Sequence, residues 1–165
     1  MSQPPSDHIA EAKQRWIEHG WPDADLMATA TSIMRVSRLL SSRTDSALRP
    51  LDLSYARFEA LSILFFEKDN ELPLGKLSER LQVHPATVTS IVDRLERQGL
   101  VRRVRREGDR RIIMAELLDP GRELVQRANE VVVREVLPKL DMPKKDQAKL
   151  YELLGAIRRS IGDFE

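Results

Sequence analysis

The stretch LGKLSERLQVHPATVTSIVDRLERQGLVRRVRREGDRR, residues 74–111, decides the fold of this chain. Leucines recur at helical spacing over about two turns, and residues 82–84 then interrupt the pattern. Pro85 suits the first position of a second helix, because its missing N–H group would be unpaired there anyway. That helix carries an apolar face of Val88, Ile91, Val92 and Leu95. Gly99 ends it, so the stretch predicts a helix-turn-helix.

The residues after Gly99 change from helical to strand-like character. LVRRVRR and IIMAELL are β-prone runs, and the EGDR between them contains a Gly-Asp pair suited to a tight turn. A helix-turn-helix followed directly by a β-hairpin is a winged helix. This combination is much more specific than either half, and we place it at residues 51–118.

Helices are expected before the winged helix and at its start. Asp7 is predicted to cap a short helix that ends near His19, and a longer helix is expected from Asp25 to about Leu48. Ser54 is expected to cap the helix YARFEALSILFF. Residues 67–73, EKDNELP, carry no periodicity and are expected to form a loop.

The chain after the hairpin is expected to be helical again. Asp119 is predicted to cap a long helix that reaches about Val136, with proline in its first turn. Residues 137–143, LPKLDMP, break the chain, and a last helix follows. The fold class is therefore mainly α (α+β): a winged helix-turn-helix with helices on both sides.

Charge is concentrated around the hairpin. The chain has 27 Lys+Arg and 26 Asp+Glu, a net charge of +1, whereas residues 94–111 contain eight arginines and three acids, a local charge of +5. The net charge of the remaining residues is therefore about −4. An anionic partner is expected to bind one face of the molecule.

Several classes of function lack the residues they need. The chain has no cysteine, which excludes disulfides, thiolate metal sites and a cysteine nucleophile. The three histidines do not have the spacing of metal ligands. The sequence GKLS lacks the upstream glycine of a phosphate-binding loop, and the GxSxG turn of a serine nucleophile is absent from the sequence. We therefore expect no enzyme, cofactor or metal. No signal peptide or membrane-spanning run is visible, so a cytoplasmic, nucleoid-associated protein without membrane contact is expected.

The exposed face of the second helix offers groups that fit the edges of DNA bases. Short hydroxyls suit base edges and thymine methyls, and arginines suit guanine edges or phosphates. The candidates on this face are His84, Thr87, Thr89, Ser90, Arg94 and Arg97. Arg94 could equally pair with Asp93 or Glu96, and the hydroxyls could be ordinary helix surface. Both interpretations stay open.

The hairpin is expected to reach sideways from this helix, with Arg110 or Arg111 at or beside its tip. A narrow A·T-rich minor groove has an enhanced negative potential that attracts such an arginine. Asp109 could hold the Arg111 guanidinium through a charge-assisted hydrogen bond. Those of the first-strand arginines that face outward would line the phosphate backbone; they are Arg102, Arg103, Arg105 and Arg106. Double-stranded DNA is the expected partner.

The stretch ATVTSIVDRLERQGLVRRVRREGDRRIIMAELLDPGREL closely resembles the MarR family of bacterial transcription regulators, and the likeness extends over residues 30–161. The resemblance implies a homodimeric transcription regulator, which we expect to be a repressor. A two-fold dimer in turn predicts a pseudo-palindromic operator with half-site centres about 10 bp apart. It assigns Asp109 and Arg111 to the family's wing positions and Arg111 to the minor groove.

Both chain ends carry apolar helices outside the winged helix. A single small domain cannot easily bury the stripe on the last helix, so a second copy is expected to cover it; the alternative is packing against the same domain. Candidates for this contact are Leu26, Ile33, Leu150, Leu153, Leu154, Ile157 and Ile161. We assign residues 25–50 and 119–165 to dimerisation and residues 1–24 to an N-terminal extension with a short helix.

The resemblance also implies a small organic-anion effector in a crevice between the dimerisation and DNA-binding parts. Candidates by position are Trp16, His19, Trp21, Tyr55, Arg57 and Phe58. Such residues are more often core or interface packing. The extra helix with Trp16 resembles the urate-responsive branch of the family. The alternative function for the whole chain is a winged-helix module that binds protein without specific DNA binding.

Overall fold

The computed structural model describes residues 6–106 and 109–165, with the side chains of residues 106–111 outside the described part. Its helices are α1 (His8–Glu18), α2 (Ala24–Leu48), η1 (Arg49–Leu51), α3 (Tyr55–Phe66), α4 (Leu74–Leu81), α5 (Pro85–Arg97), α6 (Asp119–Val131), η2 (Val132–Val136), η3 (Leu137–Leu140) and α7 (Lys144–Ser160). Its strands are β1 (Glu71–Pro73), β2 (Val101–Arg106) and β3 (Asp109–Leu117), which form an antiparallel sheet in the order β1-β3-β2. The predicted fold class is confirmed.

The helix-turn-helix consists of α4 and α5. Gln82 ends α4 in the left-handed conformation, with φ of 52°. His84 caps α5, and its Nδ1 accepts the backbone N–H of Ala86 at 3.2 Å. Gly99 follows α5 with φ of 70°, a conformation that costs glycine little. These residues give the short turn and the sharp helix end that the sequence predicts.

The core lies where α3, α4 and α5 meet the sheet. Its largest fully buried side chains are Leu48, Leu61, Leu64, Leu77, Leu95, Val88, Val92 and Val101. The apolar face predicted for α5 is buried throughout, since Val88, Ile91, Val92 and Leu95 are each at most 9% exposed. Burial of such side chains is worth about 1.5–3 kcal/mol each, so this core fixes which face of α5 points to solvent.

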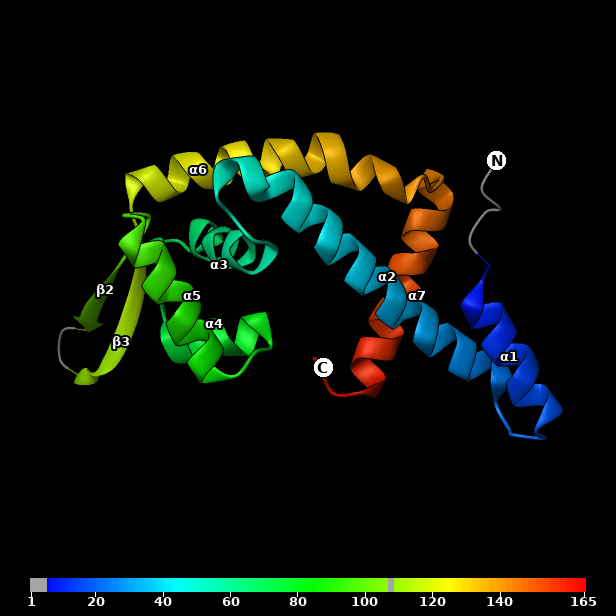
Figure 1. Ribbon diagram of the computed structural model, residues 1–165. Coiled ribbons are helices and arrows are strands. Elements are labelled where there is room, and N and C mark those ends of the chain that lie inside the picture. Colours follow the sequence, from blue (N-terminus) through cyan, green and yellow to red (C-terminus); the bar gives the residue numbers. More distant parts are fainter. Residues whose placement is uncertain (1–5, 107–108) are drawn as a thin grey trace.

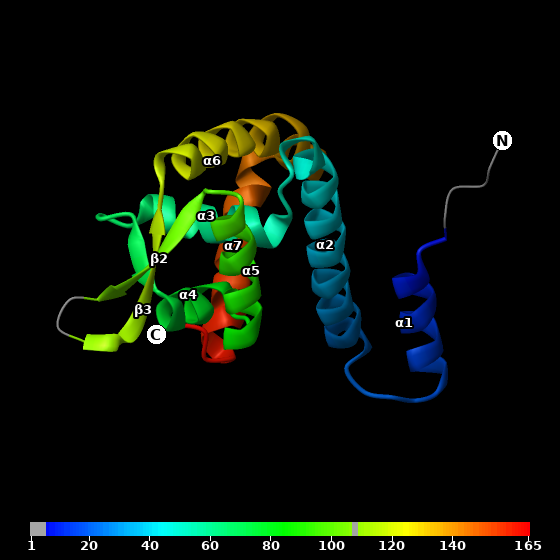
Figure 2. The same ribbon diagram turned by 60° about the vertical axis from the view of Figure 1, so that its left-hand side comes forward.

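Strands β2 and β3 form the hairpin that follows the helix-turn-helix. Their register runs from Val101 opposite Leu117 to Arg106 opposite Asp109, with an irregularity between Arg105 and Arg106. The hairpin extends away from the helices at one end of the molecule, and α1 lies beside α2 at the other end (Figures 1 and 2). The sequence predicts a tight turn at Gly108 and Asp109, but Asp109 is the first residue of β3 and pairs with Arg106. Residues 107–108 lie outside the described residues.

Long helices connect the two ends of the molecule. Figure 1 shows the continuous run of α6, η2 and η3 along the top of the molecule, after which α7 turns downward. Helix α2 descends diagonally from above α3 to α1. Within residues 6–106 and 109–165, no helix combines the length and the apolar character needed to cross a membrane.

Three local predictions are wrong. Residues 71–73 are not loop but β1, which pairs with residues 114–116 of β3 and completes the sheet. Asp119 does not cap α6: Leu118 is the N-cap residue, it makes no side-chain capping bond, and Asp119 is the first helical residue. Residues 137–140 continue the helical run as η3, so the chain breaks only at residues 141–143.

Candidate nucleic-acid interface

The solvent-facing side of α5 is polar and accessible. His84, Thr87, Thr89, Ser90 and Arg94 are all exposed, opposite the buried apolar face. The hydroxyl of Thr89 donates to the carbonyl oxygen of Pro85 at 3.1 Å, so its oxygen remains available as an acceptor. The helix therefore presents donors and acceptors along one side, as recognition of base edges requires.

Arg103 of β2 is bound to α5. Its guanidinium forms ion pairs with Asp93 and Glu96, and its Nη2 donates to the carbonyl oxygen of Thr89 at 3.0 Å. Its backbone N–H also donates to Glu96 at 2.8 Å. The side chain is 26% exposed, so the structure places Arg103 as a link between hairpin and helix rather than as an outward arginine.

The other hairpin arginines differ in their surroundings. Arg102 forms a two-pronged ion pair with Glu116 of β3, at 2.7 and 2.8 Å, which raises the pKa of Arg102. Arg105 is exposed on β2 opposite Ile113. The predicted contacts of Arg106, Asp109, Arg110 and Arg111 concern side chains that lie outside the described residues.

A polar network joins the end of α5 to the start of α3. Arg57 is buried, and its Nη1 donates to the side-chain oxygen of Gln98 at 2.9 Å. Gln98 in turn donates to the Asp52 carboxylate at 2.8 Å. Asp52 lies 3.8 Å from Arg57 and 4.0 Å from Arg94. Burial and the nearby Arg94 lower the pKa of Arg57, while Asp52 opposes the shift.

Two residues that the sequence predicts as ligand or DNA contacts, Arg57 and Arg94, have different neighbours from those expected. Arg57, a candidate effector ligand, is a buried packing residue that holds Gln98. Arg94 lies near Asp52, whereas Asp93 and Glu96 pair with Arg103. Sequence reasoning missed Asp52 and Gln98, because contacts between residues 46 positions apart leave no periodic signal.

A large, mainly apolar cavity of about 840 Å³ lies between α2, α3, the η2–η3 segment and α7. Tyr55 and Phe58 line it, as do the apolar residues Ile33, Val36, Leu40, Val132, Val136, Leu137, Leu140, Leu150 and Leu154. Lys13 and Asp25 form an ion pair at its wall. Burial raises the pKa of Tyr55 and that of its hydrogen-bond partner Glu59.

Trp16 and His19 lie outside this cavity. The Trp16 indole N–H donates to the carbonyl oxygen of Pro22 at 2.7 Å, and its ring meets that of Trp21 edge-on at 4.7 Å. His19 lies 5.8 Å from the Trp21 ring. These aromatic residues pack against one another at the turn between α1 and α2. Of the predicted effector ligands, only Tyr55 and Phe58 line the cavity.

Apolar side chains remain exposed on the helices outside the winged helix. On α7, Leu153 is 55% exposed and Ile161, which follows the helix, is 75% exposed; on α2, Leu26 is 68% exposed. Ile33, Leu150 and Ile157 are each 37–40% exposed, and Leu154 is half-buried. In the described parts of the chain, no three His, Asp or Glu side chains gather as a metal site.

Comparisons with known proteins agree with this architecture. The sequence model of the MarR family matches residues 53–113. The transcriptional regulator PecS of Dickeya dadantii is 28% identical over 159 residues, which cover 93% of this chain and 94% of PecS. The MarR family regulator Sco5413 of Streptomyces coelicolor is 36% identical, with a TM-score of 0.78, over 87% of this chain and 99% of that one.

A third comparison concerns a protein solved in complex with DNA. Sco3205 of Streptomyces coelicolor has a TM-score of 0.75 to this chain and covers 86% of it, and 91% of the Sco3205 chain is matched. Its sequence identity is 22%, so the likeness extends to the fold alone.

Proposed function

The chain belongs to the MarR family of transcriptional regulators, and we propose that it binds a specific DNA operator as a symmetric homodimer, in the cytoplasm on the nucleoid. The observation that carries this proposal is the pairing of a polar, exposed α5 face with an arginine-bearing hairpin beside it. A helix of this kind fits the major groove, and an extended hairpin reaches the neighbouring minor groove or backbone.

The proposed contacts fall into two groups. The exposed side chains of α5 would meet base edges; they are His84, Thr87, Thr89, Ser90 and Arg94. Arg105 and Arg106 would bind phosphates, and Arg110 and Arg111, with Asp109, would act at the minor groove. Arg103 would position the hairpin against α5 through Asp93 and Glu96.

The apolar faces left open on α2 and α7 support the proposed homodimer. Exposed apolar surface of this kind marks a contact with another protein, and closed two-fold symmetry is the commonest arrangement for identical chains. A two-fold dimer presents two copies of α5 to successive major grooves. Its operator would then be a pseudo-palindrome with half-site centres about 10 bp apart.

The cavity beside Tyr55 and Phe58 would hold a small organic-anion effector that releases a repressor from DNA. Its mainly apolar lining with few polar groups is the usual composition of a small-molecule site. Lys13 supplies positive charge at the cavity wall, where it now pairs with Asp25.

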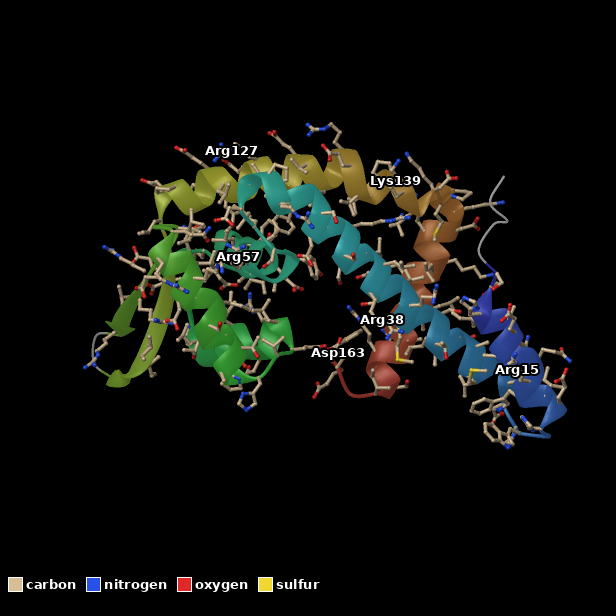
Figure 3. All side chains as sticks on the ribbon, viewed as in Figure 1. Arg15, Arg38, Arg57, Arg127, Lys139 and Asp163 are labelled. Carbon is tan, nitrogen blue, oxygen red and sulfur yellow. The ribbon has the colours of Figure 1, made fainter. Side chains whose placement is uncertain are left out.

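Arg111→Ala tests the DNA-binding role of the hairpin. We expect operator binding to weaken by about 1–3 kcal/mol while the dimer persists, because a groove contact of a single arginine is lost. Fluorescence anisotropy with operator duplex measures the affinity. Arg127→Ala is the matched control: it removes the same charge from the outer side of α6, away from α5 and the hairpin (Figure 3). Equal affinity of Arg111→Ala and the wild type would remove Arg111 from the interface.

The remaining alternative is a winged helix that binds protein instead of DNA. A protein-binding module does not need a local charge of +5 over residues 94–111. The salt dependence of DNA binding separates the two functions, since only phosphate-led binding weakens steeply with salt.

A further inference from the structure

We propose that Asp52 is a positioning residue for DNA recognition, which holds the C-terminal end of α5 and its Arg94 in place, an inference that rests on the proposed function. Asp52 lies in the connection between α2 and α3, outside both helix-turn-helix helices. It lies where the connection that follows α2 contacts the C-terminal end of α5.

The Asp52 carboxylate is shared by three side chains. Its Oδ2 accepts a hydrogen bond from Gln98 at 2.8 Å, and its backbone carbonyl accepts from the same amide at 3.3 Å. Its Oδ1 lies 3.8 Å from the Arg57 guanidinium and 4.0 Å from that of Arg94. Gln98 is the C-cap residue of α5, so Asp52 acts directly on that helix end.

Gln98 is held from both sides. Its amide nitrogen donates to Asp52, and its amide oxygen accepts from the buried Arg57 at 2.9 Å. An amide bound at both its donor and its acceptor has one favourable orientation. The C-terminal turn of α5 is thereby bound to the first turn of α3, where Arg57 lies close to α5 (Figure 3).

The guanidinium groups of Arg57 and Arg94 both lie within 4.0 Å of the Asp52 carboxylate. Arg57 and Arg94 repel each other, and this repulsion lowers the pKa of Arg57 while Asp52 acts against it. Without the Asp52 charge, the exposed Arg94 would move away from Arg57 toward solvent. Its side chain would then lose the fixed place beside the α2–α3 connection from which it meets DNA.

The loss of this charge has two opposite effects on DNA binding. Removing a negative charge from the DNA-binding side strengthens attraction to phosphates of any sequence. Releasing Arg94 weakens contacts that depend on its position, and such contacts are the ones that read sequence. The ratio of operator affinity to affinity for unrelated DNA should therefore fall, even if total affinity changes little.

Asp52→Asn removes the charge with little backbone cost. Asp52 has φ of 50°, in the left-handed region that asparagine tolerates well. The side-chain oxygen of asparagine can still accept from Gln98. Asp141→Asn is the matched control, since Asp141 also has a positive φ of 41° and follows a 3-10 helix, distant from α5.

The experiment measures affinity for operator and for scrambled duplex with four proteins besides the wild type: Asp52→Asn, Asp141→Asn, Arg94→Ala and the Asp52→Asn/Arg94→Ala double variant. We expect Asp52→Asn to reduce the affinity ratio about tenfold and Asp141→Asn to leave it unchanged. In the Arg94→Ala background, Asp52→Asn should change the ratio less than about twofold, because the residue through which it acts is gone.

Two outcomes would overturn the inference: an unchanged ratio in Asp52→Asn, or the same tenfold loss with and without Arg94. The second would mean that Asp52 affects the ratio by a route other than Arg94, and thermal unfolding of each variant would show whether that route is the stability of the fold. Failure of the wild type to prefer operator over scrambled duplex would instead contradict the proposed function, so the two failures are distinguishable.

Discussion

Removal of residues 143–165 is expected to convert the dimer into a monomer and to weaken operator binding by about 10²–10⁴-fold. The large loss arises because two linked recognition helices bind one operator with an avidity that neither has alone. The winged helix should remain folded, because none of its fully buried side chains comes from α7. Sizing with light scattering measures the mass, circular dichroism the fold, and anisotropy the affinity.

A single substitution makes the same test without truncation. Leu153→Asp places a charge on the apolar stripe of α7, at a side chain that is 55% exposed in the single chain. Burying that charge in a dimer contact would be costly, so we expect monomer. Lys145→Asp, in the first turn of α7 and outside the stripe, should leave the dimer intact. A stable dimer in the truncated protein and in Leu153→Asp would contradict the assignment of α7.

Gly121→Ala is expected to lower the free energy of unfolding by about 2–3 kcal/mol. A Cβ at this position would lie 2.2 Å from the backbone oxygen of Leu100 and 2.8 Å from a methyl carbon of Leu117. Because the nearer atom belongs to the backbone, α6 must shift away from the start of β2. The helix propensity of alanine recovers only about 1 kcal/mol of this loss.

Gly75→Ala is the control for that prediction. Gly75 lies in α4, and a Cβ there would meet nothing within 4 Å. It should therefore leave the stability unchanged or raise it by up to about 1 kcal/mol. Thermal unfolding should show Gly121→Ala melting roughly 5–10 °C below the wild type. An unchanged melting temperature would mean that α6 does not pack closely on Leu100.

The parts of the fold with regular spacing could be predicted from the sequence. Val88, Ile91, Val92 and Leu95 set the buried face of α5, and the structure buries all four. Pro85 and Gly99 mark the two ends of that helix correctly, because each acts through its own backbone. The exposed polar face of α5 follows directly from the same spacing.

The features that depend on distant contacts could not be predicted. Strand β1 is three residues long, and only its pairing with β3 makes it a strand. Arg103 and Arg105 have equivalent places in the sequence of the hairpin, yet acceptors on α5 bind Arg103 and leave Arg105 exposed. The position of Arg57 in the sequence predicts an effector ligand, whereas its hydrogen bond to Gln98, 41 residues away, makes it part of the network at the end of α5.

The salt dependence of operator binding by the wild-type protein tests the central claim most directly. Each phosphate neutralised contributes a slope of about −0.9 to the logarithm of affinity against the logarithm of salt concentration. Two subunits with at least two phosphate contacts each predict a slope of about −3.6 or steeper, with operator preferred over scrambled duplex. A flat response, with equal and weak binding of both duplexes, would contradict DNA recognition and favour a protein-binding winged helix.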